Sequence, residues 1–284
     1  MRLNRGRALV AVAGVIVATG AVQVTTAGTA LAVPDIEFEL GQSAEDSVAT
    51  KSATATCDEG QRILGGGGFL TGGGRRVQFT RLQPNGSSDT YVVTATEIGD
   101  YAGNWRVSAY GICGEAPAGL EYKSFHSFNN SDELKTGAAQ CSTGKKVLGT
   151  GARTEGGDGQ VIIEDIYVPE NLLYVSATAV EDSTGYSGNW SMWSYAVCAN
   201  PVAGQERREA PSVSDSNDKA VGVACGGGKK VHGVGGRING GDGEVMHGAI
   251  YPTGDLGSAT LISLEEANGQ ADNWNSEVFA ICAN

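Results

Sequence analysis

The feature that most constrains this chain is a threefold repeat of its rare residues. The first cysteine of each of three pairs recurs every 84 residues, and a tryptophan stands eight residues before the second cysteine of each pair. A proline recurs at nearly the same period. The positions are Pro84, Trp105, Cys57 and Cys113; then Pro169, Trp190, Cys141 and Cys198; then Pro252, Trp274, Cys225 and Cys282. Such a period indicates three copies of one supersecondary unit.

The N-terminus is typical of an export signal. A basic start precedes an apolar run and a small-x-small cleavage site, at Arg2, Arg5 and Arg7, then Ala8 to Ala18, then Ala30-Leu31-Ala32. The apolar run is too short for a convincing membrane span. We therefore expect a signal peptide at 1–32, followed by β repeats at 33–117, 118–201 and 202–284, and a secreted, extracellular product with no membrane span.

The repeats are predicted to be β-rich. Apolar residues take every second place from Leu173 to Ala179, and the segments that run from each tryptophan to its cysteine alternate in the same way. No helical period follows the signal. The fold class predicted is all-β, with three homologous, disulfide-stapled antiparallel β units of about 84 residues.

The cysteines favour one pairing. Six cysteines permit 15 pairings, and the repeat makes the pairing within each unit the most economical: Cys57–Cys113, Cys141–Cys198 and Cys225–Cys282. No two cysteines are close enough for zinc half-sites. On a straight strand each tryptophan would lie about 27 Å from its cysteine, so we expect it to close the opposite end of the core.

Charge excludes some partners. The chain has 20 basic and 32 acidic residues and a formal net charge of −12. Three of the basic residues are arginines that are lost with the expected signal peptide. We therefore expect no nucleic-acid partner, because such a protein needs a basic face.

Motif searches favour no enzyme, cofactor or metal. Gly144-Lys145-Lys146 lacks the Ser or Thr of a P-loop, and Gly156-Gly157-Asp158-Gly159 is better explained as a hairpin turn than as a calcium loop. The histidines, His126, His232 and His247, occupy non-equivalent places and no nucleophile motif accompanies them.

The candidate ligand-binding residues lie around the tryptophans. Tyr101 and Asn104 precede Trp105, and Tyr186 and Asn189 precede Trp190, where an aromatic ring beside an amide is suited to a sugar. The alternative is a turn set by Gly-Asn with the tryptophan in the core. Trp193, found in the second unit alone, faces away from Trp190 and is a candidate for an exposed contact.

The pattern Cys-x-x-Gly-x-x-Ile/Val-Leu-Gly resembles that of secreted actinobacterial β-repeat proteins. The resemblance is best at Cys57 to Gly68 and Cys141 to Gly149, with Trp105 to Cys113 and Trp190 to Cys198 as the closing half. The third unit departs from it at His232. The resemblance implies compartment and fold class but no activity. In architecture alone the chain is similar to the threefold β-prism of vitelline membrane outer layer proteins.

Two arrangements and three functions fit these observations. The units form either three sandwich modules in close contact, which we slightly favour, or one pseudo-threefold prism. The leading function is a secreted, non-enzymatic binding or adhesion protein for a glycan or protein partner. The alternatives are a structural cell-surface or matrix protein, and a hydrolase or hydrolase inhibitor.

Overall fold

The computed structural model describes residues 30–284, so most of the expected signal peptide lies outside the described residues. The strands, in chain order, are β1 (Glu37–Gln42), β2 (Thr50–Thr56), β3 (Arg62–Thr71), β4 (Val77–Asn85), β5 (Thr90–Glu97), β6 (Arg106–Gly114), β7 (Glu121–His126), β8 (Leu134–Gln140), β9 (Lys146–Glu155), β10 (Val161–Tyr167), β11 (Tyr174–Glu181), β12 (Ser191–Ala199), β13 (Glu206–Pro211), β14 (Lys219–Ala224), β15 (Lys230–Asn239), β16 (Val245–Pro252), β17 (Ser258–Glu265) and β18 (Asn275–Ala283). Between residues 30 and 284 the one helical element is a 3-10 turn, η1 (Gly74–Arg76).

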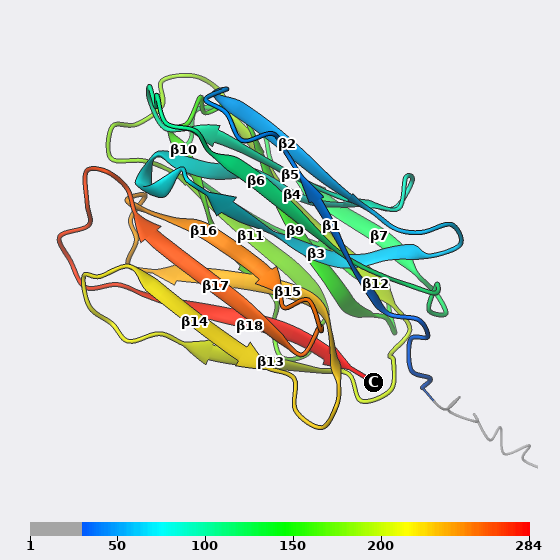
Figure 1. Ribbon diagram of the computed structural model, residues 1–284. Coiled ribbons are helices and arrows are strands. Elements are labelled where there is room, and N and C mark those ends of the chain that lie inside the picture. The colour runs from blue at the N-terminus through cyan, green and yellow to red at the C-terminus, as the bar shows by residue number, and fades with distance from the viewer. Residues whose placement is uncertain (1–29) are drawn as a thin grey trace, which may run out of the picture.

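The strands form three six-stranded antiparallel sheets, which confirms the all-β fold class (Figure 1). Sheet I has the order β1-β6-β3-β16-β17-β14. Sheet II has the order β2-β5-β4-β9-β12-β7, and sheet III the order β13-β18-β15-β10-β11-β8. Within residues 30–284 we find no apolar helix of membrane-spanning length.

Each sheet is shared between two repeats. The first repeat gives β1, β6 and β3 to sheet I and β2, β5 and β4 to sheet II, and the other repeats divide in the same way. Hydrogen-bonded pairing continues across the repeat boundaries, from β3 to β16, β4 to β9 and β10 to β15. The repeats are therefore one closed, roughly threefold body, and the slight preference for separate modules was wrong. A separate module would leave the inner edges of its half-sheets without hydrogen-bond partners.

The centre of the body depends on bulges and glycines. One β-bulge in each repeat falls at Leu64, Leu148 or His232, as the register shifts show. The next residue is always glycine, and the three backbones meet there. A Cβ on Gly149 would lie 2.0 Å from the carbonyl oxygen of Leu64, with equivalent conflicts at Gly65 and Gly233. Only glycine permits this approach.

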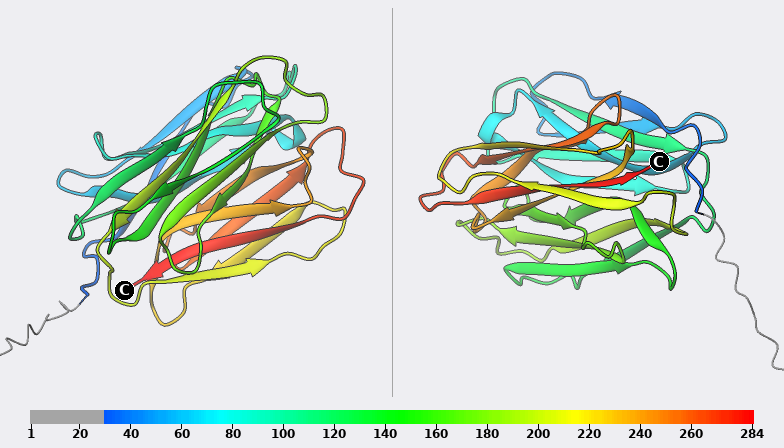
Figure 2. Two further views of the ribbon diagram at one scale, coloured as in Figure 1. Left: turned by 180° about the vertical axis from the view of Figure 1, so that it is seen from behind. Right: turned by 90° about the horizontal axis from the view of Figure 1, so that it is seen from below.

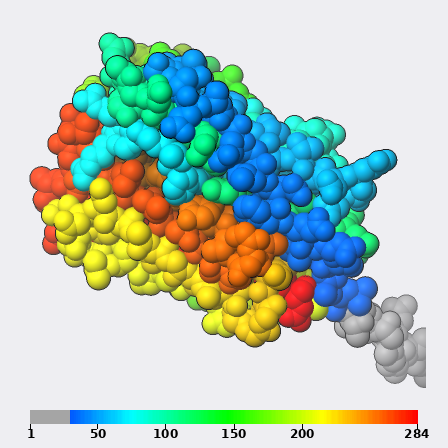
Figure 3. Space-filling view, viewed as in Figure 1, coloured from blue at the N-terminus to red at the C-terminus, as the bar shows by residue number. Residues whose placement is uncertain are grey.

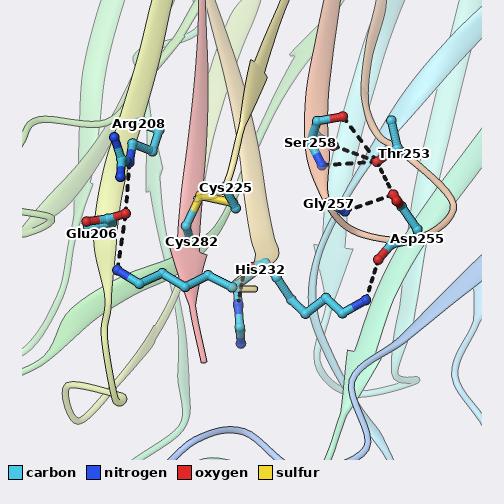
Figure 4. The surroundings of a disulfide bond; sticks show 11 residues. Glu206, Arg208, Cys225, His232, Thr253, Asp255, Gly257, Ser258 and Cys282 are labelled. Atoms are coloured by element: carbon cyan, nitrogen blue, oxygen red, sulfur yellow. Dashed lines mark hydrogen bonds and ion pairs between the residues drawn. A yellow bond between two sulfur atoms is a disulfide. The ribbon is translucent and has the colours of Figure 1, made fainter. Parts of the chain in front are cut away.

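The disulfides follow the pairing that the repeat predicts: Cys57–Cys113, Cys141–Cys198 and Cys225–Cys282. Each links two different sheets. Cys225 follows β14 of sheet I, for example, whereas Cys282 lies in β18 of sheet III. Figure 4 shows this bridge beside the ion pair of Glu206 with Arg208. The disulfides therefore link neighbouring sheets covalently.

The core lies between the sheets, and the views in Figure 2 show these sheets stacked around it. The repeated tryptophans, Trp105, Trp190 and Trp274, are at most 1% exposed. The two ends of the described chain lie side by side (Figures 1 and 3). The Val33 amide there donates a hydrogen bond to the carbonyl of Asn284 at 3.3 Å.

One local expectation, the hairpin turn at residues 156–159, is corrected. The turn at 156–159 joins β9 of sheet II to β10 of sheet III, so it is a crossover between sheets and the predicted hairpin is wrong. Asp158 adopts a positive φ of 43° there. β7 pairs with β12, which belongs to the same repeat.

Candidate functional site

The outer face of sheet II carries a row of long polar and aromatic side chains. The register places Arg81 of β4 opposite Arg153 of β9, Arg153 opposite Trp193 of β12, and Trp193 opposite His126 of β7. We call these four residues the Arg–Trp row. In the other direction Arg81 pairs with Thr94 of β5. Because side chains alternate across a strand, the row faces away from the core that holds Trp190.

The Arg–Trp row is held by stacking. The rings of His126 and Trp193 lie 3.7 Å apart and are within 9° of parallel. The guanidinium carbon of Arg153 lies 4.8 Å from the centre of the Trp193 ring. Since its two neighbours come from the strands on either side, Trp193 is a support that fixes Arg153 in place by a cation–π contact.

Two like charges meet beside this support. Arg81 is partly buried, and burial followed by the charge of Arg153 lowers its pKa. Burial raises the pKa of Tyr195 on β12, and the positive charges of Arg153 and Arg81 oppose that shift. The phenol of Tyr195 therefore lies within the field of both guanidinium groups.

A shallow hollow of about 260 Å³ adjoins the row. Its lining includes Gln83, Asn85, Tyr122, Ser124 and Tyr195. Gln83 also accepts a hydrogen bond from Nε of Arg81 at 2.7 Å. The hollow extends the row into a surface of hydroxyl, amide and guanidinium groups, which can donate to and accept from a polar ligand.

The predicted loop residues lie elsewhere, in the connections that lead into the buried tryptophans. The hydroxyl of Tyr101 donates to the carbonyl of Gly72 (2.8 Å), and that of Tyr186 donates to Asp158 (3.2 Å). In the third repeat Gln270 donates to Gly240, the counterpart of Gly72. The side chains of Tyr101, Tyr186 and Gln270 therefore link neighbouring loops by hydrogen bonds.

The remaining predicted positions differ in exposure. Asn104 and Asn189 are exposed on the same loops, so their side chains are open to solvent. Trp193 is partly exposed on the outer face of sheet II, and of the five candidates it is the one in the Arg–Trp row.

Two of the three histidines are internal. His247 is 3% exposed, and its ring nitrogens face Ser263 Oγ (3.2 Å) and the carbonyl of Glu164 (2.8 Å). His232 is fully buried, with Nδ1 near the carbonyl of Lys230 (3.1 Å). Burial lowers the pKa of each to about 4. Ser263 is itself 0% exposed, so this serine–histidine pair lies in the interior of the protein.

A cluster of three acidic side chains lies at the surface. Among residues 30–284, Glu37, Glu39 and Asp58 form the one cluster of at least three ligating side chains whose ligand atoms all lie within 4.8 Å. Burial, and then the charges of Asp58 and Glu37, raise the pKa of Glu39. Burial is the larger cause of this shift and repulsion between the carboxylates the smaller one, and no further feature there points to a cation.

The sequence analysis does not single out Arg81 or Arg153, and it names His126 only as one of three histidines in non-equivalent places. An alignment of the three repeats would have drawn attention to the arginines. The equivalent register pairs are Asp165 with Arg237 in sheet III and Ala249 with Phe69 in sheet I. The strand pairing that brings two arginines together is a property of the closed body, so it has no local signal.

Comparison with protein-family models finds no family that matches this chain. Comparison with curated proteins likewise finds no match.

Proposed function

We propose that this protein is an exported, non-enzymatic binding protein whose ligand is an extracellular glycan, and that the outer face of sheet II is its binding surface. The observation that carries the proposal is the Arg–Trp row, in which Trp193 braces a guanidinium on a flat, polar face. Beyond the Arg–Trp row, the same line of side chains continues with Thr94 on β5 and Ser52 on β2, whose hydroxyls are 2.8 Å apart. The row and these two residues together cross all six strands of sheet II. At about 4.8 Å per strand this length suits a polymer.

Two further observations support the compartment and the absence of catalysis in this proposal. Three disulfides suit an oxidising, extracellular environment, and the export signal expected from the N-terminal sequence would provide a route to it. His232 and His247 are buried and bonded to internal groups, so they are unsuited to acid–base chemistry on a soluble substrate.

The test is a screen of immobilised polysaccharides with the mature chain and two matched variants. Trp193→Ser installs the residue that sheet I carries at the equivalent place, Ser108, so the fold accepts it. Glu277→Ser makes the equivalent change in sheet III. We expect Trp193→Ser to weaken binding roughly tenfold and Glu277→Ser to leave it unchanged. Binding that is equal in both variants would reject this face as the glycan site.

A further inference from the structure

Arg81 and Arg153 are directly opposite each other where the first and second repeats join. Like charges in such cross-strand pairs destabilise a sheet. The fold does not require the pair, because the same register position holds Asp165 with Arg237 in sheet III and Ala249 with Phe69 in sheet I. The arginine pair is thus specific to sheet II.

The equivalent arginine of sheet III is neutralised. Arg237 lies 3.9 Å from Asp165 and 3.9 Å from Glu277, on the strands to either side of it. In sheet II the flanking positions are Arg81 and Trp193. The row therefore holds two arginines near one exposed carboxylate, Glu155, whereas its counterpart holds one arginine between two carboxylates.

The carboxylates around the pair are few. Within residues 30–284, Arg81 makes no ion pair with a carboxylate, and its Nε donates to the neutral amide of Gln83. Arg153 lies 3.3 Å from Glu155, whose side chain is 57% exposed. An exposed pair of this kind contributes little. Trp193, which is itself stacked on His126, meanwhile holds Arg153 in place, so the donors of Arg153 are preorganised.

We propose that Arg81 and Arg153 together bind the anionic group of a charged polysaccharide, such as a carboxylate, sulfate ester or phosphate ester. This inference rests on the proposed glycan-binding function and names the chemistry of the ligand. A guanidinium fork matches the oxygens of these groups, and two forks at one position surround a single anion. The overall charge of −12 repels dense polyanions, so the ligand carries sparse charges.

The experiment uses one backbone in three forms: dextran, lightly substituted carboxymethyl-dextran and dextran sulfate. We expect the mature chain to bind carboxymethyl-dextran roughly tenfold more tightly than dextran, and the difference to shrink at about 0.3 M salt. Arg81→Asp recreates the pair that sheet III already carries, so it should fold and should abolish the preference. The control is Arg237→Gln, which removes an arginine that lies between two carboxylates. This variant should keep the preference for carboxymethyl-dextran.

The outcomes separate the two proposals. Binding of neutral dextran as tight as that of carboxymethyl-dextran, still weakened by Trp193→Ser, would overturn the anion inference and leave the glycan function standing. Preference for the anion that survives in Arg81→Asp would also overturn the inference. If the wild-type chain binds no polysaccharide but binds polyglutamate in an Arg81-dependent way, both proposals fail in favour of an acidic protein partner.

Discussion

Nε1 of Trp105 donates a hydrogen bond to Oε1 of Glu97 at 2.8 Å. The ammonium of Lys51 lies over the same indole, 4.5 Å from the ring centre, and that lysine is 6% exposed. The second and third repeats have the same arrangement, with Glu181, Trp190 and Lys135, and with Glu265, Trp274 and Lys219. In every repeat, a buried tryptophan thus donates a hydrogen bond to a carboxylate and has the ammonium group of a buried lysine over its ring.

Loss of one of these tryptophans should destabilise the whole body. Trp190→Ala removes a fully buried indole together with partners for Glu181 and Lys135, and we expect it to lower the free energy of unfolding by about 3–5 kcal/mol. Trp193→Ala, three residues along on the outer face, is the matched control and should cost much less. Chemical denaturation of the oxidised proteins measures both. Equal midpoints for the two variants would contradict this role of Trp190.

The glycines at the centre should tolerate no side chain. Gly149→Ala would place its Cβ 2.0 Å from the carbonyl oxygen of Leu64, so we expect a loss of about 3 kcal/mol or failure to fold. Gly254→Ala is the control, because a Cβ there meets nothing within 4 Å, and its melting temperature should stay near that of the wild type. Secreted yield and thermal melting report the difference. A Gly149→Ala protein that melts like the wild type would show that the three backbones do not meet as described.

His232 occupies the bulge position that is leucine in the other two repeats. Its Nε2 is buried and has no hydrogen-bond partner among residues 30–284. We therefore expect His232→Leu to stabilise the protein by about 1–2 kcal/mol at pH 7.5.

The gain from His232→Leu should depend on pH. Burial lowers the pKa of His232 to about 4 from an ordinary 6.5, so below pH 6.5 the unfolded chain binds a proton that the folded chain refuses. The folded wild type therefore loses stability as the pH falls from 6.5 to 4, and the leucine variant is spared this part of the loss. Melting curves at several pH values test this, and an advantage that is the same at pH 4.5 and pH 7.5 would contradict it.

Glu266 should show the opposite dependence. It is 2% exposed, and burial followed by the charges of Asp182 and Glu244 raises its pKa to about 8 from an ordinary 4.5. Between these values the folded chain keeps a proton that the unfolded chain releases, so stability falls as the pH rises from 4.5 to 8.

Glu266→Gln removes this titration. The variant should gain in melting temperature over the wild type as the pH rises from about 5 to about 8, and the gain should then level off. Glu170→Gln, at an exposed carboxylate, is the control and should show no such trend. A flat difference for Glu266→Gln across this range would argue against a protonated Glu266 in the fold.

Several features of the site could be read from the sequence. Period-two alternation placed Trp193 on the face opposite Trp190, and the repeat predicted every disulfide. Arg81 and Arg153 could not be paired in advance, because they lie on strands of different repeats and meet through a junction only two residue pairs long. Nor could the loop clamps of Tyr101 and Tyr186 be distinguished from binding groups, because the sequence does not show which carbonyl or carboxylate each hydroxyl reaches.

The amino-acid sequence by itself determined the local chemistry of this protein: the strands, through alternation, and the bridges, through cysteines at a constant period. Only the tertiary structure decided that the three repeats share their sheets, because an inner strand edge can be paired by any complementary edge and the alternation pattern is the same in each case. Closure places Gly65, Gly149 and Gly233 at one centre and joins β4 to β9, and that contact between distant segments gives sheet II its two opposed arginines.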